Sequence, residues 1–417
     1  MRLTKISRQL MLFLTKNKEM NHQKMTKTTE NIITELYKEI LEAHNYLTTL
    51  KRNKSPYYSI STKKILSARQ ITKPKIFNSN SFPEIVRKHI DEMTMSEITY
   101  SFSLFDRKIK VHFILEESNV ELKLDTFAKY LDSIFMWLYV LDHYASKMCS
   151  NTLNIYLYFT SLEKKLPRSN IAILDEINVN TAFTTTCPKD SEIVVFRREE
   201  WFKVFIHETF HNFGLDFSDM NTEQATRHIL GLFKVNSQVN LYESYTEFWA
   251  EIMNALFCSF HELKNKGDIQ DFLSNAEFFI NFERSYSFIQ LVKTLNFMGL
   301  TYNDLYSNNS HSKSLRDSLY KEKTNVLSYY IIKTVLMNNF QGFLLWCKNN
   351  NFSLLQFKKT ISNQVSYCKF IERFYKSKNM LYNIEKTEKF LKKMSKKNDN
   401  ITNYLFTNLR MSICELG

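Results

Sequence analysis

The chain has 417 residues, 44% of them hydrophobic, which is enough for one large domain or two to three smaller ones. The net charge of +13 suits a nucleic-acid partner, but the basic residues are spread between apolar and acidic ones. A solvated lysine-rich surface and no specific nucleic-acid partner are therefore expected. No apolar stretch is long enough to span a membrane and the six cysteines form no CxxC pair, which predicts a soluble intracellular protein with reduced thiols.

The first 80 residues predict an accessory helical segment followed by a linker. Apolar residues recur at helical spacing within residues 28–50. Residues from about 51 to 80 are rich in Ser, Lys and Asn, which indicates a loop. The apolar run 10–14 is too short for the core of a secretory signal, and no small-residue cleavage site follows it, so no targeting segment is expected.

From about residue 81 the pattern becomes that of a small sheet with a helix. Alternating and β-branched stretches predict strands, and a long apolar stretch without Pro predicts a buried helix. In chain order the pattern gives a hairpin (98–105 and 109–115), the helix (126–146), a strand (153–160), an extended segment (178–186) and a short strand (193–196). No Pro occurs after Pro188, so the C-terminal half is expected to be mostly helical and the fold class α+β.

The motif His207-Glu208-Thr209-Phe210-His211 is the most informative stretch, and the apolar residues before it place it on a predicted helix. Residues four apart share one face of a helix, so the rings of His207 and His211 can hold one metal ion. Glu208 can then reach a water molecule on that metal and act as general base. The motif indicates a zinc hydrolase, most often a peptidase, with an ordinary amphipathic helix as the alternative.

A catalytic zinc site usually has three protein ligands, and two arrangements of the third compete. In the nearer one, of metzincin type, a glycine turn returns a ligand shortly after the second histidine. Gly214 fits that turn, but Phe217 occupies the ligand position and cannot bind zinc. Asp216 lies one residue early and Asp219 two late. Gly214 is also explained as a helix C-cap.

The farther arrangement uses a second predicted helix, from residue 242 to about 263. Glu243, Glu247 and Glu251 share one face of it, which is costly on an apolar helix unless a positive charge neutralises them. The run 247–251, E-F-W-A-E, resembles the gluzincin pattern, in which E-x-x-A-[DE] follows H-E-x-x-H. This resemblance implies Glu247 as third ligand and Glu251 as the carboxylate that orients a ligand histidine. The alternative has Glu243 as ligand and Glu247 as the carboxylate that orients a histidine. It is less favoured because Ala250, the small residue of the E-x-x-A-E run that begins at Glu247, lets the two helices approach.

The order of predicted elements resembles the N-terminal half of zincin metallopeptidases, where a small twisted sheet packs on a backing helix and on the active-site helix. That resemblance implies that residues 178–186 form an edge strand that borders the cleft and pairs with the backbone of a peptide substrate. Residues 196–218 and 243–254 are also similar to uncharacterised metallopeptidase-like proteins of large DNA viruses. A viral origin would place the protein in the host cytoplasm or the virion.

Peptide hydrolysis also needs a hydrogen-bond donor for the oxyanion of the tetrahedral intermediate. Tyr329 and Tyr330, adjacent in an apolar helical stretch, are the candidates, although packing is the commoner role in a chain with 22 tyrosines. Cys187 follows the predicted edge strand and is expected to be an inert thiol.

The sequence thus predicts a zinc-dependent metallopeptidase of gluzincin type with Zn²⁺ as cofactor and a peptide or protein as substrate. Residues 1–80 are the accessory segment and linker, 81–220 a zincin subdomain with the H-E-x-x-H helix, and 221–417 a helical subdomain with the third ligand. The oligomeric state stays open. The alternative from another class is a non-enzymatic structural or virion-associated protein that retains the fold, and the intact Glu208 argues against it.

Overall fold

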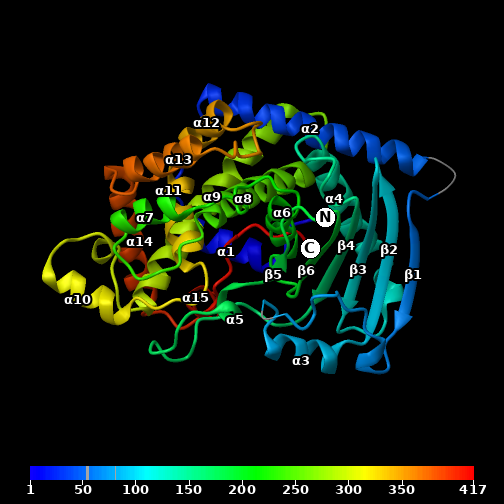
Figure 1. Ribbon diagram of the computed structural model, residues 1–417, viewed down its shortest axis with the longest axis horizontal. Coiled ribbons are helices and arrows are strands. Elements are labelled where there is room, and N and C mark those ends of the chain that lie inside the picture. The colour runs from blue at the N-terminus through cyan, green and yellow to red at the C-terminus, as the bar shows by residue number, and fades with distance from the viewer. Residues whose placement is uncertain (53–55, 80) are drawn as a thin grey trace.

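The computed structural model describes residues 1–52, 56–79 and 81–417. A mixed six-stranded sheet lies on one side and a layered body of helices on the other, which confirms the α+β class (Figure 1). The strands are β1 (Ser59–Lys64), β2 (Ser96–Leu104), β3 (Arg107–Leu115), β4 (Thr152–Phe159), β5 (Ala182–Thr184) and β6 (Asp190–Val195).

Helices make up most of the chain after residue 200, as the scarcity of Pro predicted. None of the described helices is both long and apolar enough to cross a lipid bilayer. The helices are α1 (Lys5–Lys16), α2 (Lys27–Arg52), α3 (Glu84–Met93), α4 (Leu124–Asp142), α5 (Glu176–Val179), α6 (Trp201–Asn212), α7 (Glu223–Leu232), α8 (Leu241–Glu262), α9 (Ile269–Phe297), α10 (Ser310–Leu319), α11 (Lys333–Asn338), α12 (Phe340–Asn350), α13 (Ile361–Phe374), α14 (Lys378–Met394) and α15 (Asn400–Thr407).

The sheet has the order β1-β2-β3-β4-β6-β5, so β5 is its last strand on the side of the helical body. Strands β3, β4 and β6 are parallel, and the other pairs are antiparallel. Both faces of β4 are buried because its side chains alternate between two cores. Leu153, Ile155 and Leu157 face the main core, whereas Tyr156 and Tyr158 face a smaller cluster that includes residues of α3.

Helices α6 and α8 form the centre of the main core, where they pack against each other. Helix α8 is buried along almost its whole length, including three of its four glutamates, Glu243, Glu247 and Glu251. Burial of an acidic helix face in an apolar core requires compensating charges, because an unpaired buried carboxylate is costly. The groups that pair with these glutamates include those of the candidate site described below.

The predicted hairpin, backing helix and strand order are confirmed by β2, β3, α4, β4 and β6. Only the middle of the predicted extended segment is a strand, since α5 occupies Glu176–Val179 and β5 spans Ala182–Thr184. The stretch predicted as a loop, 51–80, contains β1, which pairs with β2. Residues 53–55 and 80 of that stretch lie outside the described residues.

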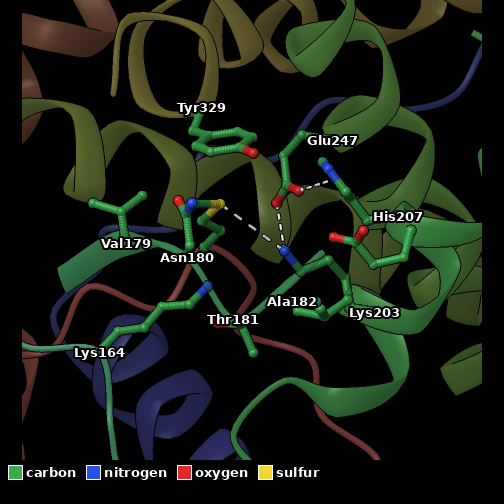
Figure 2. A pocket seen from close by; sticks show the side chains of 12 residues that line it. Lys164, Val179, Asn180, Thr181, Ala182, Lys203, His207, Glu247 and Tyr329 are labelled. Atoms are coloured by element: carbon green, nitrogen blue, oxygen red, sulfur yellow. Dashed lines mark hydrogen bonds and ion pairs between the residues drawn. The ribbon is translucent and has the colours of Figure 1, made fainter. Parts of the chain in front are cut away.

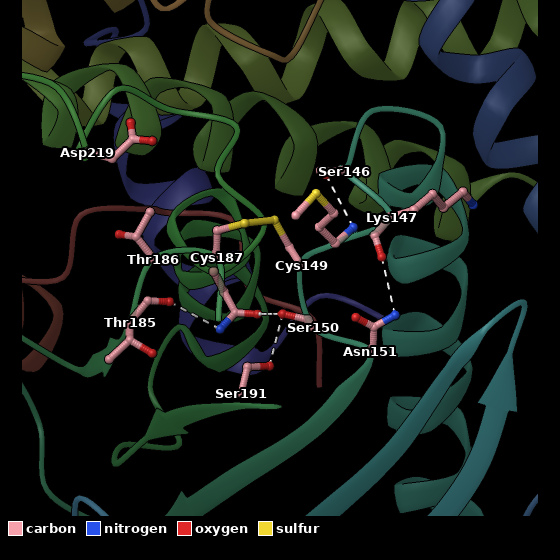
Figure 3. Close-up of a disulfide and its surroundings, with 12 residues drawn as sticks. Ser146, Lys147, Cys149, Ser150, Asn151, Thr185, Thr186, Cys187, Ser191 and Asp219 are labelled. Atoms are coloured by element: carbon pink, nitrogen blue, oxygen red, sulfur yellow. Dashed lines mark hydrogen bonds between the residues drawn. A yellow bond between two sulfur atoms is a disulfide. The ribbon is translucent and has the colours of Figure 1, made fainter. Parts of the chain in front are cut away.

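The prediction of six reduced cysteines is wrong for one pair, because Cys149 and Cys187 form a disulfide (Figure 3). Cys149 follows α4 and Cys187 follows β5, and both loops meet at the C-terminal end of α6. There the backbone N–H of Cys187 donates to the carbonyl of Asn212 (3.0 Å), and the Asn212 amide donates to Thr184 Oγ1 (2.9 Å). The disulfide therefore joins the loop after β5 to the loop after α4, and the two hydrogen bonds of Asn212 fasten the edge strand to the end of the H-E-x-x-H helix.

Loss of this disulfide is expected to lower the free energy of unfolding by about 4 kcal/mol, the chain-entropy estimate for a loop of this size. The two cysteines are 38 residues apart. Urea unfolding with and without a reductant measures the effect. In a Cys149→Ser/Cys187→Ser variant the midpoint should be lower and should no longer respond to the reductant. An unchanged midpoint on reduction of the natural chain would contradict the expectation.

Candidate metal centre

Helix α6 presents the two histidines of the motif on one buried face. His207 and His211 lie one helical turn apart, and their Nε2 atoms approach to 3.1 Å. Two imidazole nitrogens at this separation need a proton or a metal ion between them, since lone pairs that face each other repel. The predicted convergence of the two rings is therefore present in the structure.

Glu243, on the first turn of α8, completes the group. Its Oε2 atom lies 3.1 Å from His207 Nε2 and 3.3 Å from His211 Nε2. Ligand atoms that surround zinc in a regular tetrahedron at about 2.05 Å lie about 3.3 Å from one another. The three donor atoms therefore have nearly the mutual spacing of one face of such a tetrahedron, and these three residues could hold a metal ion.

The other nitrogen of each imidazole contacts a carboxylate. His207 Nδ1 lies 2.8 Å from Glu247 Oε2, and His211 Nδ1 contacts Asp216 Oδ2. An ionised carboxylate only accepts hydrogen bonds, so each Nδ1 carries the proton and each Nε2 is free to bind a metal. Carboxylate partners of this kind fix the tautomer and orientation of metal-binding histidines.

Gly214 positions Asp216 for this contact. Its φ of +65° is the left-handed conformation that favours glycine, and its N–H donates to the carbonyl of His211 (3.0 Å). The predicted C-cap is thus confirmed. The turn brings Asp216 back against His211, while Phe217 points into the core and packs on Phe357.

Charge around the triad favours a cation at its centre. Burial alone would lower the pKa of His207, but hydrogen bonds with Glu243 and Glu247 outweigh it and raise that pKa. The pKa of His211 is raised well above its ordinary value, again against burial, by Asp216 and Glu243. The same two imidazoles hold the pKa of Glu243 below its ordinary value although burial opposes this. A bound proton or a metal ion satisfies such a site, and the two compete.

Glu247, which the resemblance implied as third ligand, is placed elsewhere. Its Oε2 faces Nδ1 of His207, on the far side of the ring from the donor group, and its Oε1 accepts from Lys203 Nζ (2.6 Å). Both oxygens are therefore engaged away from the two Nε2 atoms. The structure groups Glu243 with the histidines, which is the alternative arrangement considered from the sequence.

Glu251 lies farther along α8 and does not orient a histidine among the described residues. Its carboxylate accepts from Lys333 Nζ (2.5 Å), and Ser287 lies beside it. The hydrogen bonds of Glu251 therefore go to Lys333 and Ser287, and the orienting role that the resemblance implies for it stays a prediction. Glu247 and Asp216 hold the positions beside the histidine rings instead.

Glu208 is buried beside the triad, with 7% of its surface exposed. Within the described residues its carboxylate has no hydrogen-bond partner, and burial raises its pKa despite the nearby His207 and His211. A carboxylate with a raised pKa is a better proton acceptor near neutral pH. Glu208 lines a small cavity together with His207 and Tyr329 (Figure 2).

The two tyrosine candidates differ in position. Tyr329 lies on a π-helical turn (Leu327–Ile332), lines the cavity and donates to Glu243 Oε2 (3.0 Å). Tyr330 points elsewhere and donates to the carbonyl of Leu409 (2.8 Å). Of the pair, Tyr329 is therefore the one beside the triad.

Sequence reasoning missed three residues that the structure brings to the site. Asp216 was considered only as a ligand, Lys203 precedes the motif by one helical turn, and Asn325 donates to Glu243 Oε1 (3.2 Å) from a distant loop. The spacing of Lys203 and His207 on one face of α6 was a usable signal. For Asn325 we find none in the sequence.

Comparisons of the chain with models of protein families, with curated proteins and with solved structures returned no match.

Proposed function

We propose that this protein is a zinc-dependent peptidase in which His207, His211 and Glu243 hold the metal. The observation that carries the proposal is the tetrahedral spacing of their three donor atoms, 3.1 to 3.3 Å apart, on two buried helices. Two imidazoles and one carboxylate form a donor set of catalytic zinc sites, which keep one position open. The Nδ1 partners Glu247 and Asp216 support the assignment, because they leave both Nε2 atoms free.

Zn²⁺ held by these residues would act as a Lewis acid and lower the pKa of a water molecule toward neutrality. Glu208 accepts a proton from that water and returns it to the leaving amine. Tyr329, now on Glu243, donates a hydrogen bond to the oxyanion as negative charge develops there.

The end of the sheet supports a peptide as the substrate. β5 is the last strand in the sheet order, and it packs against α6. Residues 179–182, which lead into β5, line the same cavity as Glu208. A peptide that adds to the free edge of β5 by main-chain hydrogen bonds would pass along this cavity.

The metal content and the activity of the purified full chain test the proposal. We expect about one zinc per chain, as in mononuclear catalytic sites. A mixture of random-sequence peptides should be cleaved, with activity lost in a chelator and restored by Zn²⁺. His207→Ala should lose both zinc and activity. His228→Ala is the matched control, since His228 pairs with Glu372 outside the site. Equal zinc in both variants would refute the assignment.

A further inference from the structure

A small cavity adjoins the candidate catalytic group. It is lined by residues 179–182 on the side of β5, by Lys203, His207 and Glu208 on α6, and by Lys164, Glu247, Tyr329 and Met411. Lys164, Lys203, His207 and Tyr329 can be followed in Figure 2. Its volume is about 30 Å³. The proposed mechanism uses Glu208 at its rim and leaves the interior unassigned.

The position of the cavity relates it to one side chain of a bound peptide. A peptide paired with β5 has its scissile carbonyl beside Glu208, because that is where a proton can be taken from the attacking water. Side chains of an extended strand alternate, so a residue next to the scissile bond projects toward residues 179–182, which line the cavity. The cavity is therefore placed to receive a side chain that flanks the cleaved bond.

Its size admits only a short side chain. A single water needs about 10 to 15 Å³ measured in this way, so the cavity has room for roughly two heavy atoms. Met411 lines the cavity, with its sulfur 4.0 Å from Lys203 Nζ, and its segment is held firmly: Ser412 N–H donates to Glu200 Oε1, and the side chain of Arg410 donates to the carbonyl of Ser412. A larger side chain could enter only by displacing this buried segment.

Two lysines that line the cavity supply hydrogen-bond donors. Lys164 Nζ donates to Glu200 Oε2 (3.0 Å), and Lys203 Nζ donates to Glu247 Oε1 (2.6 Å). An ammonium group carries three N–H donors, so each lysine keeps donors beyond these ion pairs. Figure 2 shows both side chains directed toward the same space. A ligand atom that accepts a hydrogen bond fits there better than a methyl group.

We propose that this cavity is a specificity subsite for a short side chain that accepts hydrogen bonds, serine foremost, next to the cleaved bond, and that Met411 sets its depth. The proposal rests on the peptidase function and names the substrate class of that site. Peptides with glycine, alanine or serine on one side of the cut bond are substrates, with serine preferred. Leucine, phenylalanine and lysine at that position are poor substrates.

The cleavage profile of the natural chain on a random-sequence peptide mixture, read by mass spectrometry, tests the subsite. We expect one flanking position to be restricted to short residues, with kcat/KM for a leucine peptide lower by about 10- to 200-fold than for its serine counterpart. Cleavage between two large residues would contradict the proposed subsite but not the peptidase function. Absence of cleavage by the zinc-loaded protein would overturn the peptidase proposal and the subsite with it.

A Met411→Ala variant tests whether Met411 limits the depth of the cavity. Met411→Ala should raise the leucine-to-serine ratio of kcat/KM by about tenfold or more, because it shortens a side chain that lines the cavity. Ile413→Ala is the matched control: Ile413 is buried in the same segment and does not line the cavity. Its ratio should equal that of the natural chain. A ratio unchanged in folded Met411→Ala would overturn the role of Met411.

Discussion

Replacement of Glu208 by glutamine is expected to lower kcat for peptide hydrolysis by about 100- to 10,000-fold, the usual contribution of a general base. Glutamine has the shape of glutamate but cannot take up a proton near neutral pH. Glu208 contacts neither the Nε2 atoms nor the Nδ1 atoms of the two histidines, so zinc content should stay that of the natural chain. Initial rates on one cleaved peptide and metal analysis of the same sample measure both quantities.

The control for this variant is Glu223→Gln, which makes the same change on the exposed start of α7. Its kcat and zinc content should match those of the natural chain. Retention of more than a tenth of the natural kcat in Glu208→Gln would show that another group accepts the proton. Loss of zinc would show instead that Glu208 acts on the metal centre itself.

The parts of the fold predicted from sequence are those with a clear period. The hairpin and the strand 153–160 alternate between apolar and polar residues or between two cores, and the long C-terminal helices are apolar and free of Pro. β1 was missed for a physical reason: every residue of Ser59–Lys64 is exposed, so the strand has no apolar face. Its conformation depends on backbone pairing with β2, which the sequence of 59–64 does not encode locally.

The candidate site could likewise be predicted only in part from the sequence. His207, Glu208 and His211 were predictable because one helix fixes their relation to one another. The third member of the candidate metal group was not, because Glu243, Glu247 and Glu251 share a face and differ only in their position along α8. Successive turns of a helix are about 5.4 Å apart, so the level at which α6 crosses α8 selects one of them. That level is a property of the packed core.

The pairing of Cys149 with Cys187 shows the same limit. Cysteine spacing alone does not reveal that the loops after α4 and β5 converge at the end of α6. The contact between His211 and Asp216 also depends on a conformation, the left-handed turn at Gly214. Gly214 indicated a turn after the H-E-x-x-H motif but not which side chain the turn brings back against His211.

Two glutamate-to-glutamine substitutions on one face of α8 are expected to have opposite effects, one on metal binding and the other on stability. Glu243→Gln should weaken zinc binding by more than the about 10- to 100-fold expected when only an orienting carboxylate is lost. Its partners besides the histidines are the neutral donors Tyr329 and Asn325, and the histidines can release a proton when its charge is lost, so near neutral pH the metal-free protein should keep most of its stability. Competition with a chromophoric chelator and urea unfolding of the metal-free protein measure the two effects.

Glu247→Gln should show the reverse. The amide oxygen can still accept from His207 Nδ1, so zinc affinity should fall by no more than about 10- to 100-fold. The buried Lys203 loses its ionised partner, which costs about 3–5 kcal/mol when one member of a buried ion pair is removed. Glu251→Gln, which touches Lys333 and neither histidine, should leave zinc affinity unchanged. Weaker zinc binding in Glu247→Gln than in Glu243→Gln would restore Glu247 as the third ligand, because only a residue that contacts the metal produces the larger loss.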